Sequence, residues 1–481
     1  MTKLLLLNPP FLPKYSRSSR SPAVTKSGTI YYPLWLAHAT GLLEKRGHEV
    51  LLLDVPARGG VIEDYRERIV GFNPDIIVVD TSTPSIESDV ACLATLKEWF
   101  ADRKVGVLVG THPTALVHET CALSPAVDVI ARGEYDWSLA ELADRGGIPD
   151  GVPGLSWRNN GQIVDNPERA PAENLDELPF VSAVYKKHLV ITDYFYAHCR
   201  NPVVSIFAGR GCPNRCFYCV YPQVMFGHRY RHRSAAHLVD ELAYIERELP
   251  EVREVLIDDD NFTADQAFVA EVCQEIIQRS IRIPWTAEVR VNLPYDVMRL
   301  MRAAGCRLLV AGFESGDQGV LNAINKNATL EQARRFMQDA RKAGLRVHGC
   351  FMVGNRGETR ATMYATLRFA LELDSDTVQF FPLMVYPGTE AYRWASENRY
   401  VVARSWREWL TADGMHSCVV KTEWLSPEEL VDFCDYARRR FYLRPRYLMR
   451  KAFDVILHPG EFSRTAKAGV SLVGHFFRRH R

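Results

Sequence analysis

The chain has 481 residues, of which 47% are hydrophobic and 24% charged, and its formal charge is +1. This composition is ordinary for a folded globular protein, and it excludes collagen, low-complexity and mainly disordered chains. Because no uninterrupted apolar run reaches the roughly 20 residues of a membrane span, and the start lacks a signal-peptide cleavage site, we expect a cytoplasmic protein.

The first 142 residues alternate short apolar runs with amphipathic helical patterns. The expected strands are Lys3–Leu7, Glu49–Leu53, Asp75–Val79, Val105–Val109 and Val127–Ile130. Helical spacing lies between them, as in Trp35–Lys45, which stops at Gly47, a residue type that favours a helix C-terminus. Such alternation predicts an α/β domain with a doubly wound parallel sheet, in which ligands bind at the carboxyl ends of the strands.

Residues 143–200 lose this rhythm and are rich in Gly, Pro, Asp and Asn, so we interpret them as a linker.

Strand–helix alternation resumes over 201–390. The expected strands there are Val203–Ala208, Glu254–Ile257, Ile283–Glu288, Arg307–Phe313, Arg346–Met352 and Thr377–Pro382. Six such units with long helices favour a partial (β/α)6 barrel, whose chemistry would lie at the strands' carboxyl ends. Residues 391–481 form a helical C-terminal region with a basic tail.

Three of the eleven cysteines are clustered, as Cys212, Cys216 and Cys219, directly after the first expected barrel strand. In a reducing compartment such clusters indicate metal ligands or catalysts. Structural zinc sites usually have four ligands. His228 and His232 lie near the cysteines in sequence, so a zinc site remains the alternative interpretation. An iron–sulfur cube held by three thiolates would instead leave one iron open to another ligand.

The C-x3-C-x-aromatic-C pattern, with Tyr218 before the last cysteine, resembles that of the radical S-adenosylmethionine (radical SAM) enzymes over residues 200–390. The resemblance implies a [4Fe–4S] cluster on the three cysteines that cleaves SAM reductively to a 5′-deoxyadenosyl radical. It also implies SAM contacts at the ends of the barrel strands. These contacts are Tyr218, Asp260, Arg290, Glu314 and Ser315. A barrel-mouth salt bridge is the alternative interpretation of Arg290 and of Glu314.

The N-terminal domain is similar to the cobalamin-binding domain that precedes the barrel in the B12-binding-domain-containing radical SAM superfamily. The resemblance implies that cobalamin meets residues that follow the expected strands. These residues are Asn8, Thr81, Ser82, Gly110, Thr111 and Gly133. The D-x-H-x-x-G element that carries a cobalt-binding histidine elsewhere is absent, so His112 is not assigned as a ligand. The alternative is a structural remnant that binds no cofactor.

The resemblance implies a group that includes hopanoid-associated enzymes, anaerobic magnesium-protoporphyrin ester cyclase and C-methyltransferases. C-methylation of an unactivated carbon is the expected reaction. A cyclase or carbon–carbon coupling enzyme is the alternative, and a non-catalytic cobalamin or metal sensor comes after it. A flavodoxin- or ferredoxin-type donor would supply electrons.

Residues 438–481 hold ten Arg and two Lys against Asp454 and Glu461. This basic, aromatic tail favours contact with a membrane surface and a lipophilic small-molecule substrate. The alternative is a helix packed on the barrel. A tRNA-modifying role is the runner-up, given the charge of the tail, but a nucleic acid is not the expected partner, since the sequence shows no recognisable RNA-binding module.

Overall fold

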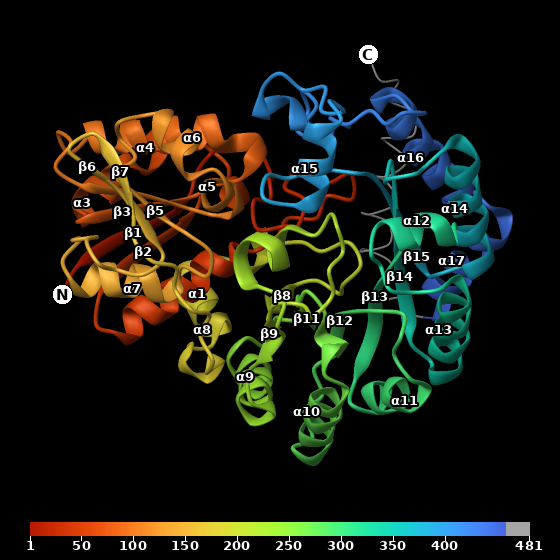
Figure 1. The fold of residues 1–481 in the computed structure, drawn as a ribbon. Coiled ribbons are helices and arrows are strands. Elements are labelled where there is room, and N and C mark those ends of the chain that lie inside the picture. The colour runs from red at the N-terminus through yellow and green to blue at the C-terminus, as the bar shows by residue number, and fades with distance from the viewer. Residues whose placement is uncertain (458–481) are drawn as a thin grey trace.

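Seven strands form the sheet of the N-terminal half in this computed structural model, which describes residues 1–457 (Figure 1). They are β1 (Lys3–Asn8), β2 (Glu49–Asp54), β3 (Ile76–Asp80), β4 (Val105–Val109), β5 (Val129–Ala131), β6 (Leu155–Asn159) and β7 (Gln162–Asp165). The strand order is β2-β1-β3-β4-β5-β6-β7, and the first five strands pair in parallel. The chain therefore reverses direction across the sheet between β1 and β3, where such folds open a ligand crevice.

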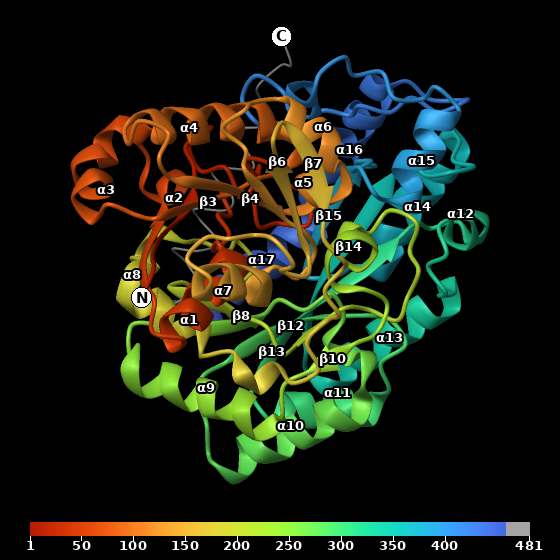
Figure 2. The same cartoon turned by 60° about the vertical axis from the view of Figure 1, so that its left-hand side comes forward.

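Helices cover both faces of this sheet (Figure 2). They are α1 (Leu34–Lys45), α2 (Val55–Arg58), α3 (Arg66–Phe72), α4 (Ile86–Glu98), α5 (Thr111–Ala115), α6 (Val117–Ala122), α7 (Asp136–Asp144) and α8 (Val181–His188). On β1, Leu4 and Leu6 belong to the core that includes α1 and α7, whereas Leu5 and Leu7 belong to the core under α4. Strand side chains alternate between faces, so this continuous leucine run fills both cores. The predicted doubly wound sheet is confirmed.

Residues 143–200, predicted as a linker, contain regular structure. The β6–β7 hairpin continues the sheet beyond β5 in antiparallel pairing, and α8 packs against α1. The sheet thus extends to Asp165, past the predicted boundary at residue 142. The division of the chain into domains at 142, 200 and 390 stays a prediction.

A second parallel sheet curls into a half-barrel in the order β15-β14-β13-β12-β11-β8. Its strands are β8 (Val203–Ile206), β11 (Glu254–Ile257), β12 (Trp285–Val289), β13 (Cys306–Glu314), β14 (Arg346–Val353) and β15 (Thr377–Pro382). The helices along its outside are α9 (Ala235–Glu248), α10 (Gln266–Gln278), α11 (Tyr295–Ala303), α12 (Gln318–Ala323), α13 (Leu330–Ala343) and α14 (Arg360–Leu373) (Figure 1). The predicted six-stranded partial barrel is confirmed, with β8 and β15 as its edges.

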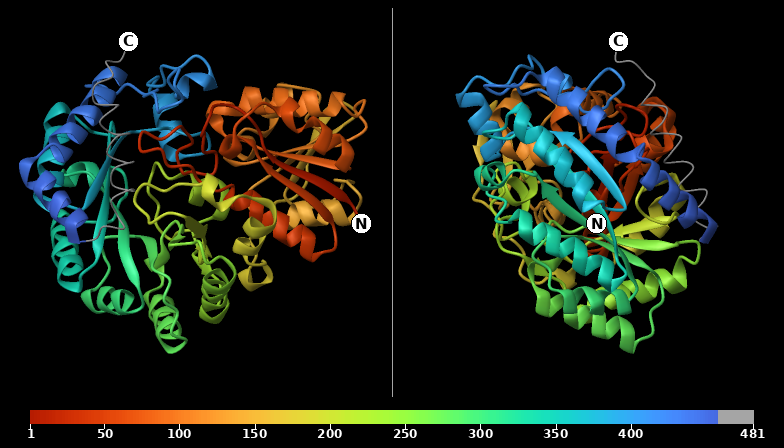
Figure 3. Two further views of the ribbon diagram at one scale, coloured as in Figure 1. Left: turned by 180° about the vertical axis from the view of Figure 1, so that it is seen from behind. Right: turned by 90° about the vertical axis from the view of Figure 1, so that its right-hand side faces the viewer.

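The C-terminal region contains α15 (Glu390–Glu397), α16 (Pro427–Tyr442) and α17 (Pro445–Leu457). Residues 398–426, predicted as part of a helical region, are mostly irregular and include one short 3-10 helix at Trp406–Trp409. Helix α16 begins at a capping box of Ser426 and Glu429 and packs on β15. Figure 3 shows α16 and α17, in blue, along the outer side of the barrel. The rest of the predicted basic tail, residues 458–481, lies outside the described residues. Among residues 1–457, no helix is both long and apolar enough to cross a bilayer.

Buried charges join the two halves beside the barrel mouth. The Arg210 guanidinium, 1% exposed, lies 2.8 Å from Glu134 and 2.7 Å from Asp136, both of which belong to the N-terminal half. Arg231 lies 2.7 Å from the other oxygen of Glu134. Arg210 and Arg231 come from β9 (Gly209–Arg210) and β10 (Arg231–His232), which pair with each other. Two cations and two carboxylates therefore balance at the junction of the halves.

We predict that Arg210→Ala lowers the free energy of unfolding by about 3–5 kcal/mol, because it leaves two carboxylates buried with one cation fewer. Urea denaturation of the cofactor-free chain measures this loss. Arg247→Ala is the matched control, since Arg247 is 69% exposed and pairs with Glu248 on the surface. Equal stability of the two variants would contradict a structural role for the buried network.

Candidate active site

The three clustered cysteines lie on one loop that follows β9 at the mouth of the half-barrel. The loop begins at Gly211, whose φ is +85° and whose missing Cβ would lie 2.3 Å from the Arg229 carbonyl oxygen. Only glycine fits this close approach, and it turns the chain into the loop. Cys212 and Cys216 are buried, and Cys219 is half-buried. The sequence placed these thiols at the end of the first barrel strand, and the structure gathers them there.

Burial and a nearby carboxylate favour the protonated thiols of Cys212 and Cys219 in the cofactor-free chain. Burial raises the pKa of Cys212 and Cys219, and the nearby Asp260 carboxylate raises both further. Iron binding must therefore displace these protons, as it does at other thiolate sites. Among residues 1–457, no three His, Cys, Asp or Glu side chains are already grouped as a metal site. The fit to an iron–sulfur cluster accordingly rests on the donor set, three neighbouring thiols on one loop.

Gln223 holds the cysteine loop in shape, and sequence reasoning missed it. Its amide nitrogen lies 3.2, 3.2 and 2.9 Å from the carbonyl oxygens of Cys216, Phe217 and Cys219. Its amide oxygen accepts the N–H of Glu390, at the start of α15, at 2.9 Å. One side chain thus ties the loop backbone to the C-terminal region. The only sequence signal was an amide residue four positions after the last cysteine.

Glu314 ends β13 in a conformation that few residues adopt. Its φ is +62°, and the pairing of β13 with β14 shifts register between Gly312 and Glu314. The carboxylate lies 2.7 Å from Lys326 Nζ. A Cβ on Gly312 would lie 2.3 Å from the Glu314 carboxylate oxygen, so a larger residue there would displace this carboxylate. Such a strained backbone typically persists where function requires a fixed side chain.

Arg290 and Tyr218 join Glu314 next to the cysteines. The Arg290 guanidinium lies 3.5 Å from Cys216 Sγ and donates to the Lys326 carbonyl oxygen. Burial raises the pKa of the Tyr218 phenol, and the charges of Glu314 and Cys216 raise it further. The structure therefore brings together three of the residues predicted to meet SAM.

Asp260, also predicted to meet SAM, faces a cation that sequence reasoning missed. Arg20, from the segment between β1 and α1, lies 2.7 Å from Asp258, 3.4 Å from Asp260 and 3.1 Å from Glu288. Burial raises the pKa of Asp260, and the Arg20 guanidinium limits that rise. No sequence pattern around Arg20 indicated this contact, because its partners lie more than 230 residues away.

Ser315 is the predicted SAM residue that lies apart from this group. Its hydroxyl is fully buried, lies 3.2 Å from the Thr366 hydroxyl on α14 and accepts the Asp317 N–H at 3.1 Å. The side chain thus fastens the turn after β13 to the helix layer. The G-x-E-S-G pattern alone could not show which of its members faces the barrel mouth.

Four of the residues predicted to meet cobalamin gather at the carboxyl edge of the N-terminal sheet. The Thr81 hydroxyl donates to the Val109 carbonyl at 2.8 Å, beside Gly110, whose φ is +122°. A Cβ on Gly110 would lie 2.4 Å from the Thr81 carbonyl oxygen. Thr111 begins α5, and the Gly133 N–H donates to the Thr114 hydroxyl of that helix at 3.1 Å. This glycine cradle suits a close-lying ligand.

Asn8 and Ser82 are engaged inside the N-terminal half. Asn8 donates to Asp54 at 2.8 Å and accepts from Arg17 at 2.7 Å. The Ser82 hydroxyl lies 2.7 Å from the phenol oxygen of Tyr15. Both residues therefore hold the segment that leads from β1 to Arg20.

His112, not assigned as a cobalt ligand, is buried against the Trp406 ring, with Nδ1 3.2 Å from the Thr83 hydroxyl. Burial lowers the pKa of His112 to about 3, so the imidazole is neutral at physiological pH. The side chain is enclosed by packing rather than presented to a ligand.

A crevice lies between the N-terminal sheet and the segment that follows the last of the three cysteines. Its lining includes Asp80, Thr81, Gly110 and Thr111 from the sheet, Arg17, Ser18, Ser19 and Arg20 from the segment after β1, and Val220, Tyr221 and Met225 from the barrel. Its volume is about 20 Å³, which holds about one water molecule. These lining residues could contact the polar edge of a ligand. A group as large as a corrin enters only if the segment after β1 moves.

A larger cavity of about 330 Å³ lies at the β15 edge of the half-barrel. Residues of the segment before α1, of β14 and β15, and of α16 and α17 form its walls. Its polar groups include His348 and Gln379, whose side chains lie 3.2 Å apart. Most of its wall is apolar, including Phe381, Met415 and Leu448.

Comparison with known proteins agrees with both halves of this arrangement. The model of the radical SAM superfamily matches residues 206–370, and that of the B12 binding domain matches residues 20–143. An uncharacterized methyltransferase of Pyrococcus horikoshii is 30% identical over 456 residues, which cover 94% of this chain and 95% of that protein. The chain belongs to the radical SAM enzymes that carry a B12-binding domain.

Further similarities lie within the same superfamily. The anaerobic magnesium-protoporphyrin IX monomethyl ester cyclase of Rubrivivax gelatinosus is 26% identical over 86% of this chain and 74% of its own length. The radical SAM methyltransferase TsrM of Kitasatospora setae has the same fold, with a TM-score of 0.66 and 19% identity over 93% of this chain and 90% of that one. As a radical SAM enzyme with a B12-binding domain, the protein uses a [4Fe–4S] cluster, SAM and cobalamin.

We predict that Cys216→Ala abolishes the cluster, because two thiolates cannot hold it as three do. Anaerobic reconstitution with iron, sulfide and hydroxocobalamin, followed by iron and cobalt counts per chain, measures the effect. Cobalt binding should persist, since the residues predicted to meet cobalamin lie in the other half. Cys273→Ala, at a buried thiol of α10, is the control and should keep its iron. Undiminished iron in Cys216→Ala would refute the assignment.

We expect Gln223→Leu to weaken cluster retention without removing a thiol, because three loop carbonyls lose their donor. The rate of iron loss to a chelator should rise about tenfold, on the basis of roughly 1.4 kcal/mol for the lost hydrogen bonds. Gln278→Leu, on the exposed surface of α10, serves as the control. Equal chelation rates for the two variants would show that Gln223 does not position the loop.

Proposed function

We propose that the protein is a cobalamin-dependent radical SAM methyltransferase that methylates an unactivated carbon of a lipophilic small molecule. The supporting observation is that one crevice is lined by the carboxyl edge of the N-terminal sheet and by Val220, Tyr221 and Met225, which follow the last of the three cysteines. In each fold the carboxyl edge of the sheet is where ligands react. A substrate at this crevice would therefore lie within reach of both cofactor sites.

Different residues at the barrel mouth would hold the cluster and bind SAM. Cys212, Cys216 and Cys219 would hold the cluster. Glu314 and Asp260 suit the amino group of SAM, and Arg290 suits its carboxylate, because opposite charges with hydrogen bonds give the strongest polar contacts. When bound, the cluster and SAM supply radical hydrogen abstraction, and cobalamin supplies a transferable methyl group.

On the other side of the crevice, the sheet edge would seat cobalamin against backbone and hydroxyl groups. The proposed contacts are Asn8, Thr81, Ser82, Gly110, Thr111 and Gly133. The buried crevice would exclude water from reactive species, which prevents side reactions. A flavodoxin- or ferredoxin-type protein would supply the reducing electron.

The proposed lipophilic character of the substrate is supported by the largely apolar cavity of about 330 Å³ at the open edge of the half-barrel. Tyr31 lines this cavity. Burial raises the pKa of its phenol, the nearby carboxylates of Asp258 and Glu288 raise it further, and the Arg20 guanidinium lowers it. The cavity thus adjoins the charged group at the barrel mouth. Apolar cavities with a few polar groups are typical small-molecule sites.

A radical SAM cyclase or carbon–carbon coupling enzyme, without methyl transfer, is the second candidate. It is supported by the 26% identity to the magnesium-protoporphyrin ester cyclase over most of this chain. A non-catalytic sensor of cobalamin or metal would be a third class of protein with the same binding residues.

Product analysis separates the candidates. The reconstituted enzyme with reductant, SAM and substrate candidates should release both S-adenosylhomocysteine and 5′-deoxyadenosine if it transfers methyl groups. Release of 5′-deoxyadenosine alone would favour the cyclase, and release of neither would favour the sensor.

We expect Glu314→Gln to lower 5′-deoxyadenosine formation about 100-fold, since roughly 2.7 kcal/mol is a typical loss for a charged hydrogen bond. Glu372→Gln, half-exposed on α14, is the control.

A further inference from the structure

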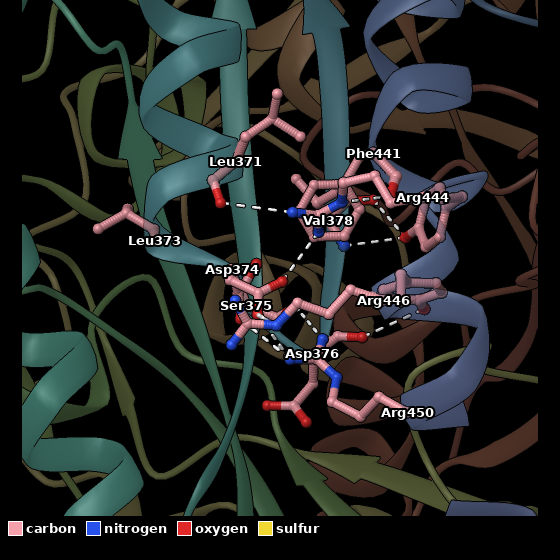
Figure 4. A network of polar contacts seen from close by, with 12 residues as sticks. Leu371, Leu373, Asp374, Ser375, Asp376, Val378, Phe441, Arg444, Arg446 and Arg450 are labelled. Carbon is pink, nitrogen blue, oxygen red and sulfur yellow. Dashed lines mark hydrogen bonds and ion pairs between the residues drawn. The ribbon is translucent and has the colours of Figure 1, made fainter. Parts of the chain in front are cut away.

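Helix α17 turns its polar side toward the protein. Arg444, just before the helix, and Arg450 within it lie 2.9 and 3.0 Å from the two carboxylate oxygens of Asp374, which ends α14 (Figure 4). Tyr447 is 7% exposed, and its hydroxyl donates to the Asp376 carbonyl oxygen at 3.2 Å. The helix is therefore fastened through arginines and a tyrosine, the residue types that ordinarily face water.

The opposite side of α17 presents apolar side chains to solvent. Met449, Phe453 and Ile456 are 58%, 65% and 71% exposed. Their spacing of four and three residues places them on one face of the helix. Leu443 and Leu448 extend this apolar face and are each 52% exposed. An outward apolar face of this kind marks an interaction surface, because water does not stabilise it.

Cations surround the apolar face. Residues 438–457 contain six Arg and one Lys against one acidic residue, Asp454. Arg446 is 85% exposed, and Arg439 and Arg440 are exposed at the end of α16. The sequence continues over residues 458–481 with five more Lys or Arg and one Glu. Exposed apolar residues bordered by cations are the signature of helices that lie in the interface of an anionic bilayer.

The same surface borders the large cavity. Leu443, Leu448 and Lys451 line the cavity of about 330 Å³, and the first two are also half-exposed to solvent. The far wall includes Gln379 and Phe381 of β15. A molecule that leaves the apolar face of α17 would therefore meet the cavity beside Leu443 and Leu448.

We propose that α17 and the end of α16 bind the surface of an anionic lipid bilayer, and that the adjoining cavity receives the substrate directly from that bilayer. The membrane surface is independent of the reaction, whereas the entry route rests on the proposed function. The apolar face would insert among the headgroups, and the arginines beside it would pair with lipid phosphates. The Asp374 contacts would hold the helix in the orientation that presents this face.

Sedimentation with lipid vesicles tests the surface. The full chain should bind vesicles of equal parts phosphatidylcholine and phosphatidylglycerol more tightly than vesicles of phosphatidylcholine alone, and added salt should weaken binding. Phe453→Glu with Ile456→Glu should lower the affinity about tenfold or more, because both side chains would leave the interface. These side chains are exposed, so we expect the variant to fold. Ile277→Glu, at a 46% exposed residue of α10, should bind as the wild type does.

Three results would overturn the membrane surface: no vesicle binding, equal binding to neutral vesicles, or equal loss in the Ile277→Glu control. A dimer that the Phe453→Glu change dissociates would overturn it too, since a second copy would then cover the face. Sedimentation needs neither iron nor SAM, so its outcome is separate from methyl transfer. A chain that binds vesicles but releases no S-adenosylhomocysteine would retain the surface and refute the proposed reaction and entry route.

Discussion

The architecture of the site depends on the buried ion pairs between Arg210 and the two carboxylates of Glu134 and Asp136. Arg210 directly precedes Gly211, where the cysteine loop begins, and Glu134 directly follows Gly133 on the N-terminal sheet edge. The ion pairs therefore hold the start of the cysteine loop against the edge of the N-terminal sheet. Buried charges are costly without their partners, and this cost favours a docking of the two halves that keeps these pairs.

Much of the fold could be predicted from the sequence, because strands buried on both faces read as continuous apolar runs. The runs around Leu4 and Ile77 marked their strands to within a residue or two. The β6–β7 hairpin lies in the segment predicted as a linker, because β7 is only partly buried and carries little apolar signal. Its place is set by pairing with β5, a contact that local sequence does not encode.

The candidate site divides in the same way. The cysteine spacing indicated cluster ligands because all three lie within one loop, and strand ends pointed to Arg290 and Glu314. Gln223 and Arg20 could not be found, since their contacts depend on how distant segments meet. The orientation of Ser315 toward Thr366 likewise depends on the register shift at the end of β13. Sequence spacing locates residues at an edge, and packing decides which way they point.

Arg20 has a consequence for the modularity of this enzyme. A guanidinium from the first residues of the chain sits among Asp258, Asp260 and Glu288 of the barrel. A barrel separated from its N-terminal half would gather three carboxyl groups without this counter-ion and would also lose the partners of Arg210. The N-terminal half and the barrel therefore depend on each other for charge balance and are not independent units. A chimaera of two relatives would keep this charge balance only if the arginine and its three acidic partners were carried together.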